Sequence, residues 1–468
     1  MNFSNTAFLK KILAVFIFLL LVTSPEILSR SAHPSYIESL SQKEENQLFR
    51  SLLSKNKLGF DELMNDYSWF NGNIMLIKNH RVIYQHCQGY ANFRTRELLT
   101  PESSFELASV SKQFTAVAIL QLYERGQLDI DDKLNKYIPE LTYDEVTIRH
   151  LLNHTSGLPN YMWFVEDSWE KPYYPDNEDM IALLVDEKAK LLFRAGTIHS
   201  YSNTGYAILA SVIERVTKQS FTRFLYENIF DPLEMYNTFT SAELIDSTIQ
   251  IKSMALGHRT IRRGLLSITP SVHNRILGDK GIHSTLEDLY KWDQGLYSDK
   301  ILSQETLKQA YEPTMLSKKR NVPYGFGFRT GDLEGERYVY HHGLWEGFRN
   351  AFVRYINSGD AVIILNNANQ RGYNYVLDKF QKIIEEDDFQ LTPVQQIAFD
   401  IATEGRSAVE FISNNNVVDK LSVNEKDILE ITSLLVEMDK PAIAGLIYEF
   451  FENNGLIKQS TSNIVSVD

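Results

Sequence analysis

Residues 105–114 read Phe-Glu-Leu-Ala-Ser-Val-Ser-Lys-Gln-Phe, and an apolar run continues from there to residue 122. The change from polar to apolar residues predicts the first turn of a buried helix. Ser109 and Lys112 are three residues apart and would face the same side of that turn. Burial disfavours the ammonium form and lowers a lysine pKa by up to about 3–5 units, so Lys112 could accept the Ser109 proton. The positive end of the helix would favour the alkoxide.

The Ser-x-x-Lys spacing is a weak signal by itself. Ser54 and Lys57 show it, as do Ser168 and Lys171, and neither pair opens an apolar helix. An isolated pair of this kind is usually part of a solvated first turn. The assignment of a nucleophile therefore depends on further motifs along the chain.

The composition is that of an acidic, globular chain. Of 468 residues, 43% are hydrophobic and 23% are charged, and the formal net charge is −13. This length suits one large domain or two ordinary ones. The negative charge disfavours binding to nucleic acid or to an anionic membrane.

Metal-binding patterns are weak. Cys87 is the single cysteine, so neither an intrachain disulfide nor a cysteine cluster for zinc can form. His150 and His154 have helical spacing, but the zinc-protease pattern requires Glu after the first His, and Leu151 stands there. Structural histidines are the better interpretation, and we predict neither a metal nor a cofactor.

The first 30 residues have the pattern of an export signal. Lys10 and Lys11 precede an unbroken apolar run over residues 12–22, which is short for a bilayer span but suits the hydrophobic region of a signal peptide. Pro25 closes the run, and no clear Ala-x-Ala cleavage site follows. We therefore predict an exported protein, periplasmic or extracellular, with residues 1–30 as a signal peptide or an uncleaved membrane anchor.

Hydrophobic patterns organise the rest of the chain. Residues 31–59 suit a helical lead-in, and residues 74–77 and 82–84 a β-hairpin. Ser284 or Thr285 is expected to cap a helix. Further strands are expected at residues 324–330, 337–340, 351–356 and 361–365.

Residues 386–468 show helical periodicity, including the segments 394–401, 409–412, 428–438 and 442–451. They predict a helical appendage without catalytic groups, and this appendage could bind a protein partner.

Residues 161–174 are aromatic and acidic without clean periodicity. They read as a long irregular loop, which is either a wall that selects substrate shape or a packed surface loop. Trp345 is a further candidate for the wall of a pocket.

Two more polar groups punctuate the chain. Tyr201 and Asn203, two residues apart in extended chain, would point to one side. A phenol can relay protons and an amide can bind a substrate carbonyl, although a helix cap beside a packed Tyr explains the same residues. Farther on, residues 341–348 read His-His-Gly-Leu-Trp-Glu-Gly-Phe between two predicted strands. Backbone N–H groups there could help form an oxyanion hole; the alternative is a turn with exposed histidines.

In this order, Ser109-Val110-Ser111-Lys112, Tyr201-Ser202-Asn203 and His341-His342-Gly343 resemble the motifs of the serine β-lactamase and penicillin-binding-protein superfamily. The class C β-lactamase-like hydrolases, which include D-alanyl-D-alanine carboxypeptidases, D-aminopeptidases and esterases, are the most similar branch. Residues 151–159, 201–206 and 278–289 also look like recurrent phrases of that family. The resemblance covers residues 60–385 and implies an α+β fold: a mixed, mainly antiparallel sheet flanked by helices, with an all-helical subdomain.

The resemblance also implies roles for individual residues. Ser109 matches the acylated nucleophile, Lys112 its base partner and Tyr201 the proton shuttle. The substrate-binding positions are Asn203, His341, Gly343 and Leu344, the last of which would complete an oxyanion hole with the N–H of Ser109. The family usually has Lys where His341 stands, and a histidine with a pKa of about 6.5 is a poor fixed positive charge near neutral pH.

We therefore predict an exported serine hydrolase that cleaves an ester or a D-amino-acid amide. The runner-up is a DD-peptidase or weak β-lactamase that acts on a peptidoglycan peptide or a β-lactam. A hypothesis of another class is a non-catalytic binding or sensory protein on the same fold. Binding to a membrane is expected only if the N-terminal segment stays uncleaved.

Overall fold

The computed structural model describes residues 44–45, 64, 67–262, 264–316, 320–333, 335–370, 372–386, 392–404, 424–438 and 440–453. The chain consists of two compact units, and one of them is Gly59–Asp387. Residues 1–30 and all but two of residues 31–59 lie outside the described residues, so the export signal and the helical lead-in stay predictions. Among the described residues, no helix is long and apolar enough to cross a membrane.

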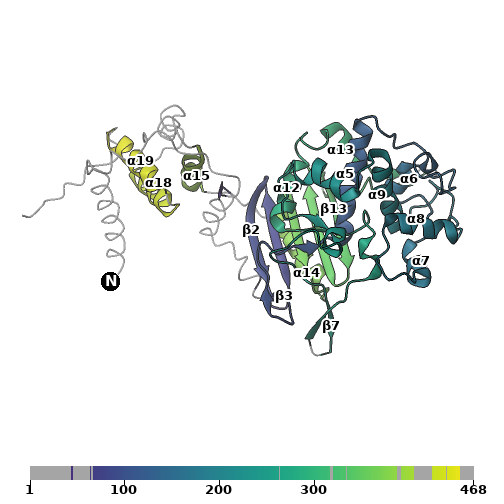
Figure 1. Cartoon of the computed structure of the whole chain (residues 1–468). Helices are drawn as coiled ribbons and strands as arrows, with labels where there is room; N and C mark the ends of the chain where they lie inside the picture. The colour runs from purple at the N-terminus through teal and green to yellow at the C-terminus, as the bar shows by residue number, and fades with distance from the viewer. Residues whose placement is uncertain are drawn as a thin grey trace, which may run out of the picture. The chain divides into compact units, whose positions relative to one another are not determined.

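A six-stranded antiparallel sheet organises the Gly59–Asp387 unit (Figure 1). The strands, in spatial order, are β12 (Arg329–Leu333), β13 (Glu336–Trp345), β14 (Phe348–Tyr355), β15 (Asp360–Asn366), β1 (Gly72–Lys78) and β2 (Arg81–Gln88). The first strand of the sheet in sequence therefore pairs with the last, as in the register Ile74↔Ile364. The hairpin of β1 and β2 is as predicted: Asn79 and His80 form a two-residue turn with φ angles of 48° and 66°, which suits a hairpin.

Both faces of the central strands are buried. Met75 and Ile77 of β1 belong to the main hydrophobic cluster, whereas Leu76 faces the other way because side chains alternate along a strand. Leu76 lies opposite Tyr84 in the register, and Phe380 of α14 (Tyr373–Glu386) stacks on that ring at 6.1 Å. The sheet is thus a middle layer with α14 on one face and the larger helical region on the other.

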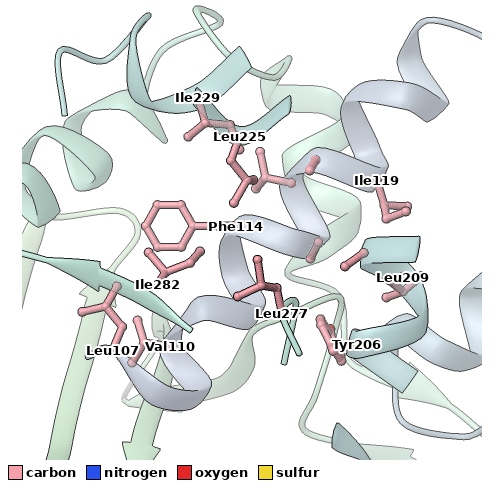
Figure 2. Packing of buried hydrophobic residues seen from close by; sticks show 14 of the residues in the cluster. Leu107, Val110, Phe114, Ile119, Tyr206, Leu209, Leu225, Ile229, Leu277 and Ile282 are labelled. Atoms are coloured by element: carbon pink, nitrogen blue, oxygen red, sulfur yellow. The ribbon is translucent and has the colours of Figure 1, made fainter. Parts of the chain in front are cut away.

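The helical region surrounds one buried helix, α5 (Ser111–Glu124). Its first twelve residues are buried on all sides, as expected for a helix at the centre of a core. Phe114 stacks on Trp292 with ring centroids 4.1 Å apart, and Figure 2 shows it beside Ile282. The surrounding helices are α6 (Ile148–Leu152), α7 (Tyr161–Ser168), α8 (Asn177–Asp186), α9 (Asn203–Thr217), α10 (Phe221–Leu225), α11 (Ser241–Ile245), α12 (Leu286–Gly295) and α13 (Gln304–Ala310).

Short elements complete this unit. The 3₁₀ and π turns are η1 (Ala108–Val110), η2 (Leu134–Lys136), η3 (Tyr226–Phe230) and η4 (Val272–Arg275). The small sheets are β5 (Phe105–Glu106) with β9 (Ile282–Ser284) and β6 (Phe239–Thr240), β3 (Tyr90–Asn92) with β4 (Glu97–Leu98), β7 (His258–Ile261) with β8 (Gly264–Ser267), and β10 (Thr314–Met315) with β11 (Asn321–Val322). Thr285, one of the two predicted caps, accepts the Asp288 N–H at the start of α12.

Two strand predictions need correction. The segment 324–330 is not one strand, because Gly327 adopts a φ of +78° and its backbone packs against the Lys112 carbonyl of α5. The strand β12 starts only at Arg329. Conversely, β13 does not end before the histidines: it continues to Trp345, paired with β14, and the turn is Glu346-Gly347.

The helices near the C-terminus belong to the other unit and agree with three of the predicted segments. They are α15 (Pro393–Glu404), α18 (Glu425–Glu437) and α19 (Pro441–Asn453). The predicted helical segment at residues 409–412 lies outside the described residues. The division of the chain at residues 30, 59 and 385 stays a prediction.

Candidate active site

Ser109 lies immediately before α5, in the 3₁₀ turn η1. This turn follows β5, and Lys112 is the second residue of the helix. The Lys112 Nζ lies 3.2 Å from the Ser109 Oγ. The two residues therefore meet as the spacing predicted, although the serine precedes the α-helix rather than belonging to it.

A strained residue precedes Ser109. Ala108 has a φ of +54°, a conformation that costs free energy for a residue with a side chain. The buried Glu106 carboxylate accepts the Ala108 N–H at 3.2 Å and the Gly281 N–H at 2.8 Å. On the other side, Gly343 of β13 approaches so closely that a Cβ there would lie 2.2 Å from the Leu107 carbonyl oxygen. Glu106 and Gly343 thus fix the turn that carries the serine.

Glu106 carries a negative charge in this buried place. Burial raises the pKa of its carboxyl, but the His283 imidazole, 3.0 Å away, and the Gly281 N–H outweigh this effect, so the pKa lies below its ordinary value. A charged acceptor makes a stronger hydrogen bond to the Ala108 N–H than a neutral one would.

Lys112 is fully buried among three hydrogen-bond partners. Besides Ser109, its Nζ donates to the Asn203 Oδ1 at 2.9 Å and to the Asp279 carbonyl oxygen at 2.7 Å. Burial lowers the pKa of Lys112 from its usual 10.5 to about 7; the Asp279 carboxylate opposes this change, and the Arg329 guanidinium adds to it. A substantial fraction of this lysine is therefore a neutral amine at neutral pH.

Tyr201 and Asn203 reach Lys112 from the start of α9. Ser202 caps that helix by accepting the Gly205 N–H, so Asn203 is not the cap. Asn203 is thereby free to bind the lysine, and the Tyr201 ring centroid lies 4.9 Å from the Lys112 Nζ. Burial raises the pKa of the Tyr201 phenol, and the Ser109 hydroxyl only partly offsets this, so the phenol is protonated at neutral pH. The residue remains 37% exposed, on the side of the pocket.

His341 is a buried, neutral histidine rather than a residue of an exposed turn. Its Nδ1 lies 2.8 Å from the His342 carbonyl oxygen, which only accepts hydrogen bonds, so Nδ1 carries the proton. The Nε2 then accepts the Tyr324 hydroxyl at 3.2 Å. Burial, together with the Lys112 charge, lowers the pKa of His341 well below its ordinary value. His341 therefore supplies no fixed positive charge.

Arg329, which the sequence did not single out, supplies the cation that His341 lacks. It is the first residue of β12 and pairs with Tyr340 in the register. Its guanidinium lies 5.5 Å from the Tyr201 ring centroid and 5.7 Å from that of Tyr324. No carboxylate among the described residues forms an ion pair with it, so its charge is available to a ligand.

These residues surround a cavity of about 390 Å³. Its lining consists of Ser109, Tyr201, Asn203, Arg329, Tyr340, His341, His342 and Leu344. Five of the seven predicted site residues are thus exposed to one pocket. Of the other two, Lys112 lies buried beneath the serine, and Gly343 packs behind the strained turn.

The predicted aromatic wall lies elsewhere. Residues 161–168 form α7, capped by Asn160, because Tyr161, Met162 and Val165 have helical spacing and bury one face. Neither residues 161–174 nor Trp345 contribute to the lining; the Trp345 Nε1 donates to the Asn274 Oδ1 at 2.9 Å instead. The predicted loop is therefore largely a packed helix outside the pocket.

His150 and His154 also have structural roles. His150 closes the capping box of α6 with Thr147, and the buried His154 Nδ1 accepts the Ser202 N–H at 3.1 Å. Among the residues that the structure describes, no group of three or more potential metal ligands occurs.

A serine in contact with a buried lysine of lowered pKa, on this sheet-and-helix fold, is the arrangement of a serine hydrolase. The model of the family described as Beta-lactamase matches residues 60–381, so the chain belongs to the β-lactamase family, and the resemblance predicted from the sequence is confirmed.

Curated relatives and solved structures agree. Penicillin-binding protein 4* of Bacillus subtilis is 33% identical over 319 residues, which cover 65% of this chain and 70% of that protein. D-aminopeptidase of Brucella canis is 28% identical over 284 residues, or 61% of this chain; the match spans only 54% of that relative. The octameric penicillin-binding protein homologue from Pyrococcus abyssi superimposes with a TM-score of 0.60 and 26% identity, covering 74% of this chain and 81% of the other.

Proposed function

We propose that the protein hydrolyses an ester or an amide through an acyl-enzyme on Ser109, with Lys112 as the base. The observation that carries this proposal is the arrangement around the Lys112 Nζ. A neutral amine has two N–H groups and one lone pair, and both Asn203 Oδ1 and the Asp279 carbonyl oxygen can only accept. They take the two N–H groups, so the lone pair faces Ser109, the one partner whose hydroxyl can donate.

The steps follow from this geometry. Lys112 accepts the Ser109 proton as the Oγ attacks the substrate carbonyl carbon, and a tetrahedral oxyanion forms. Tyr201, whose phenol is protonated, passes its proton to the leaving amine or alkoxide as the acyl-enzyme forms, and the proton held by Lys112 then restores the phenol. Water then attacks the acyl carbon while Lys112, neutral again, takes a proton from it, and that proton returns to the Ser109 Oγ as the carboxylic acid leaves. The lowered pKa of Lys112 and the raised pKa of Tyr201 favour Lys112 over Tyr201 as the principal base.

The oxyanion would be held by backbone N–H groups. The ladder between β12 and β13 ends at the pair Arg329↔Tyr340. Within the described part of the sheet, residues 341–345 of β13 therefore have a strand partner on one edge only, that of β14. Leu344 lies in this segment and Ser109 lies beside it in the pocket lining, which supports the assignment of their N–H groups to the oxyanion hole.

Two substrate classes follow from the relatives, and Arg329 favours one of them. The names of the relatives point to D-amino-acid peptides or amides and to penicillins. The eight residues that line the pocket include the Arg329 cation and no Asp or Glu. A carboxylate near the scissile bond, as in a DD-peptide or a penicillin, would pair with this guanidinium, whereas a free amino group would find no counter-ion there. The DD-peptidase or weak β-lactamase is therefore the second candidate function.

Covalent labelling tests the acyl-enzyme mechanism and, with a second probe, the substrate class. Intact-mass spectrometry after exposure to a fluorophosphonate is expected to show one adduct on the wild type and none on Ser109→Ala. Failure to label the wild type would contradict the acyl-enzyme mechanism and favour a binding protein.

Benzylpenicillin tests the role of Arg329. Loss of a charge-assisted hydrogen bond worth about 1.5–3 kcal/mol predicts that Arg329→Met is acylated by penicillin about 10–100 times more slowly. Measured at about pH 9, where Lys112 is neutral with or without the Arg329 charge, labelling by the neutral fluorophosphonate should change little. Arg223→Met is the matched control, because that arginine pairs with Glu227 away from the pocket. A wild type that penicillin never acylates would leave the ester or D-amino-acid amide hydrolase as the function.

We also propose an exported location and a protein partner. A periplasmic or extracellular location, with residues 1–30 removed or kept as an anchor, is tested by sequencing the N-terminus of the protein recovered from each cell fraction. The helices α15, α18 and α19 are the proposed site for a protein partner, which co-purification with and without residues 386–468 would reveal.

A further inference from the structure

A buried ion pair lies directly behind the proposed base. Asp279 and Lys280 follow one another in the segment between η4 and β9, with 1% and 3% of their surfaces exposed. The Lys280 Nζ lies 3.7 Å from the Asp279 Oδ1. Two buried lysines therefore share the neighbourhood of one carboxylate, and only one of them takes part in the mechanism above.

The surroundings of Lys280 fit an ammonium. Its Nζ donates to the His273 carbonyl oxygen at 2.9 Å, the Ile276 carbonyl oxygen at 3.1 Å and the Tyr161 hydroxyl at 2.9 Å. Three acceptors match the three N–H groups of a charged lysine. The Tyr161 hydroxyl in turn donates to the Asp279 Oδ2 at 3.3 Å. Both carboxylate oxygens thus face partners that belong to the Lys280 network.

Lys112, by contrast, binds the main chain of Asp279 and not its carboxylate. Its Nζ takes the Asp279 carbonyl oxygen, while the side chain of Asp279 points into the network of Lys280 and Tyr161. A nearby carboxylate without a partner of its own would favour the ammonium form of Lys112, and an ammonium has no lone pair with which to accept a proton.

The other titratable groups around the two lysines give Asp279 a distinct place. The groups that face Lys112 are Asp279, Lys280, Arg329, His154, His341, Tyr201 and Tyr206. Those that act on Lys280 are Asp279, Glu106, Lys112 and Glu346. Asp279 is the one carboxylate in the first set. Among the described residues, the negative charge that acts on Lys112 therefore depends on how far the Asp279 carboxylate is neutralised.

We propose that Lys280 is a positioning residue: it holds the Asp279 carboxylate in its own ion pair and so keeps Lys112 available as the base for Ser109. This inference rests on the proposed function. It predicts that the loss of Lys280 and the loss of the Asp279 charge move the pKa of Lys112 in opposite directions. Without Lys280, the Asp279 carboxylate has no buried ammonium of its own and its charge acts more strongly on Lys112. Without the charge of Asp279, Lys112 loses the one carboxylate that faces it among the described residues.

The test is the pH dependence of Ser109 modification in the full chain. The rate of fluorophosphonate labelling is measured from pH 5 to 9 for the wild type, Lys280→Met, Asp279→Asn and the double variant. An opposite charge within about 4–6 Å moves a pKa by about 1–3 units. We therefore expect the acid limb of the profile of labelling rate against pH to move up by about one pH unit in Lys280→Met and down by about one in Asp279→Asn. The double variant should return toward the wild type.

Lys78→Met is the control for general destabilisation, because Lys78 also pairs with a buried carboxylate, Asp360 at 2.9 Å, but does not line the pocket. It should lose stability and keep the acid limb of the wild type. Limbs that coincide in all four proteins, or that move in the same direction in both single variants, would overturn the role of Lys280. If Lys280→Met does not fold, the near-isosteric Asp279→Asn still shows in which direction the charge of Asp279 moves the acid limb. Absence of labelling in the wild type would instead overturn the proposed function, and with it this inference.

Discussion

Replacing Lys112 by Met should remove a pH-dependent cost from the folded state. The folded pKa of Lys112, about 7, lies below its usual 10.5, so the unfolded chain binds more protons between these two values. The stability of the wild type should therefore rise with pH across this window, and the penalty is largest below pH 7. Lys112→Met has no such group, and its stability should lack this increase.

The magnitude follows from the two pKa values. From pH 7 to pH 9, the wild type should gain about 2 kcal/mol of unfolding free energy relative to Lys112→Met. At pH 7, the variant avoids a penalty of about 4 kcal/mol in unfolding free energy. It also leaves Asn203 and the Asp279 carbonyl without their donor, which costs about 1–3 kcal/mol for each group and offsets part of that gain. The change with pH is therefore a sharper test than the sign at one pH.

Urea unfolding followed by tryptophan fluorescence measures this difference. All five tryptophans lie between residues 69 and 345, so the signal reports on the unit that holds the site. Ser109→Ala is the control, because it keeps the lysine and should show the pH dependence of the wild type. Parallel curves for the wild type and Lys112→Met between pH 7 and 9 would refute the reasoning.

Three further predictions concern the site. With a Lys112 pKa of about 7, the neutral fraction rises about tenfold from pH 6 to pH 8; the rate of fluorophosphonate labelling should follow it, and a flat profile would exclude Lys112 as the base. In Gly343→Ala, a Cβ 2.2 Å from the Leu107 carbonyl oxygen should cost about 1–3 kcal/mol in chemical unfolding and slow labelling; unchanged stability and rate would contradict the tight packing. Tyr201→Phe should slow turnover of an amide about 10²–10⁴-fold, and that of a p-nitrophenyl ester, whose leaving group needs no proton, far less; equal losses would argue against Tyr201 as the acid.

Local patterns were sufficient where the chemistry is local. Ser109 and Lys112 meet because one helical turn separates them, and the hairpin of β1 and β2 follows from alternation and a two-residue turn. The order of the three motifs was enough to indicate the fold. Strong periodicity likewise predicted α15, α18 and α19.

Features that depend on long-range packing were not predictable. Nothing in residues 324–330 marks Arg329 as a pocket residue, since its place depends on the pairing of β12 with β13 and on the glycine that bends the chain before it. Lys280 lies in the segment 278–289, which resembles a family phrase, but nothing in the sequence indicates that its side chain meets Tyr161 and the His273 carbonyl. The aromatic helix α7 was missed because its buried face consists of only three residues.

The position of Arg329 at the edge of the sheet has an evolutionary consequence. β12 is an edge strand, with β13 as its one neighbour in the described sheet, whereas Ser109, Lys112 and Asn203 belong to elements anchored in the helical core. A mutation in β12 disturbs one strand ladder at the edge of the sheet, while a mutation around α5 disturbs a helix whose first twelve residues are all buried. Divergence of such enzymes toward new substrates can therefore proceed through this strand at small cost in stability, with the acylation machinery inherited intact.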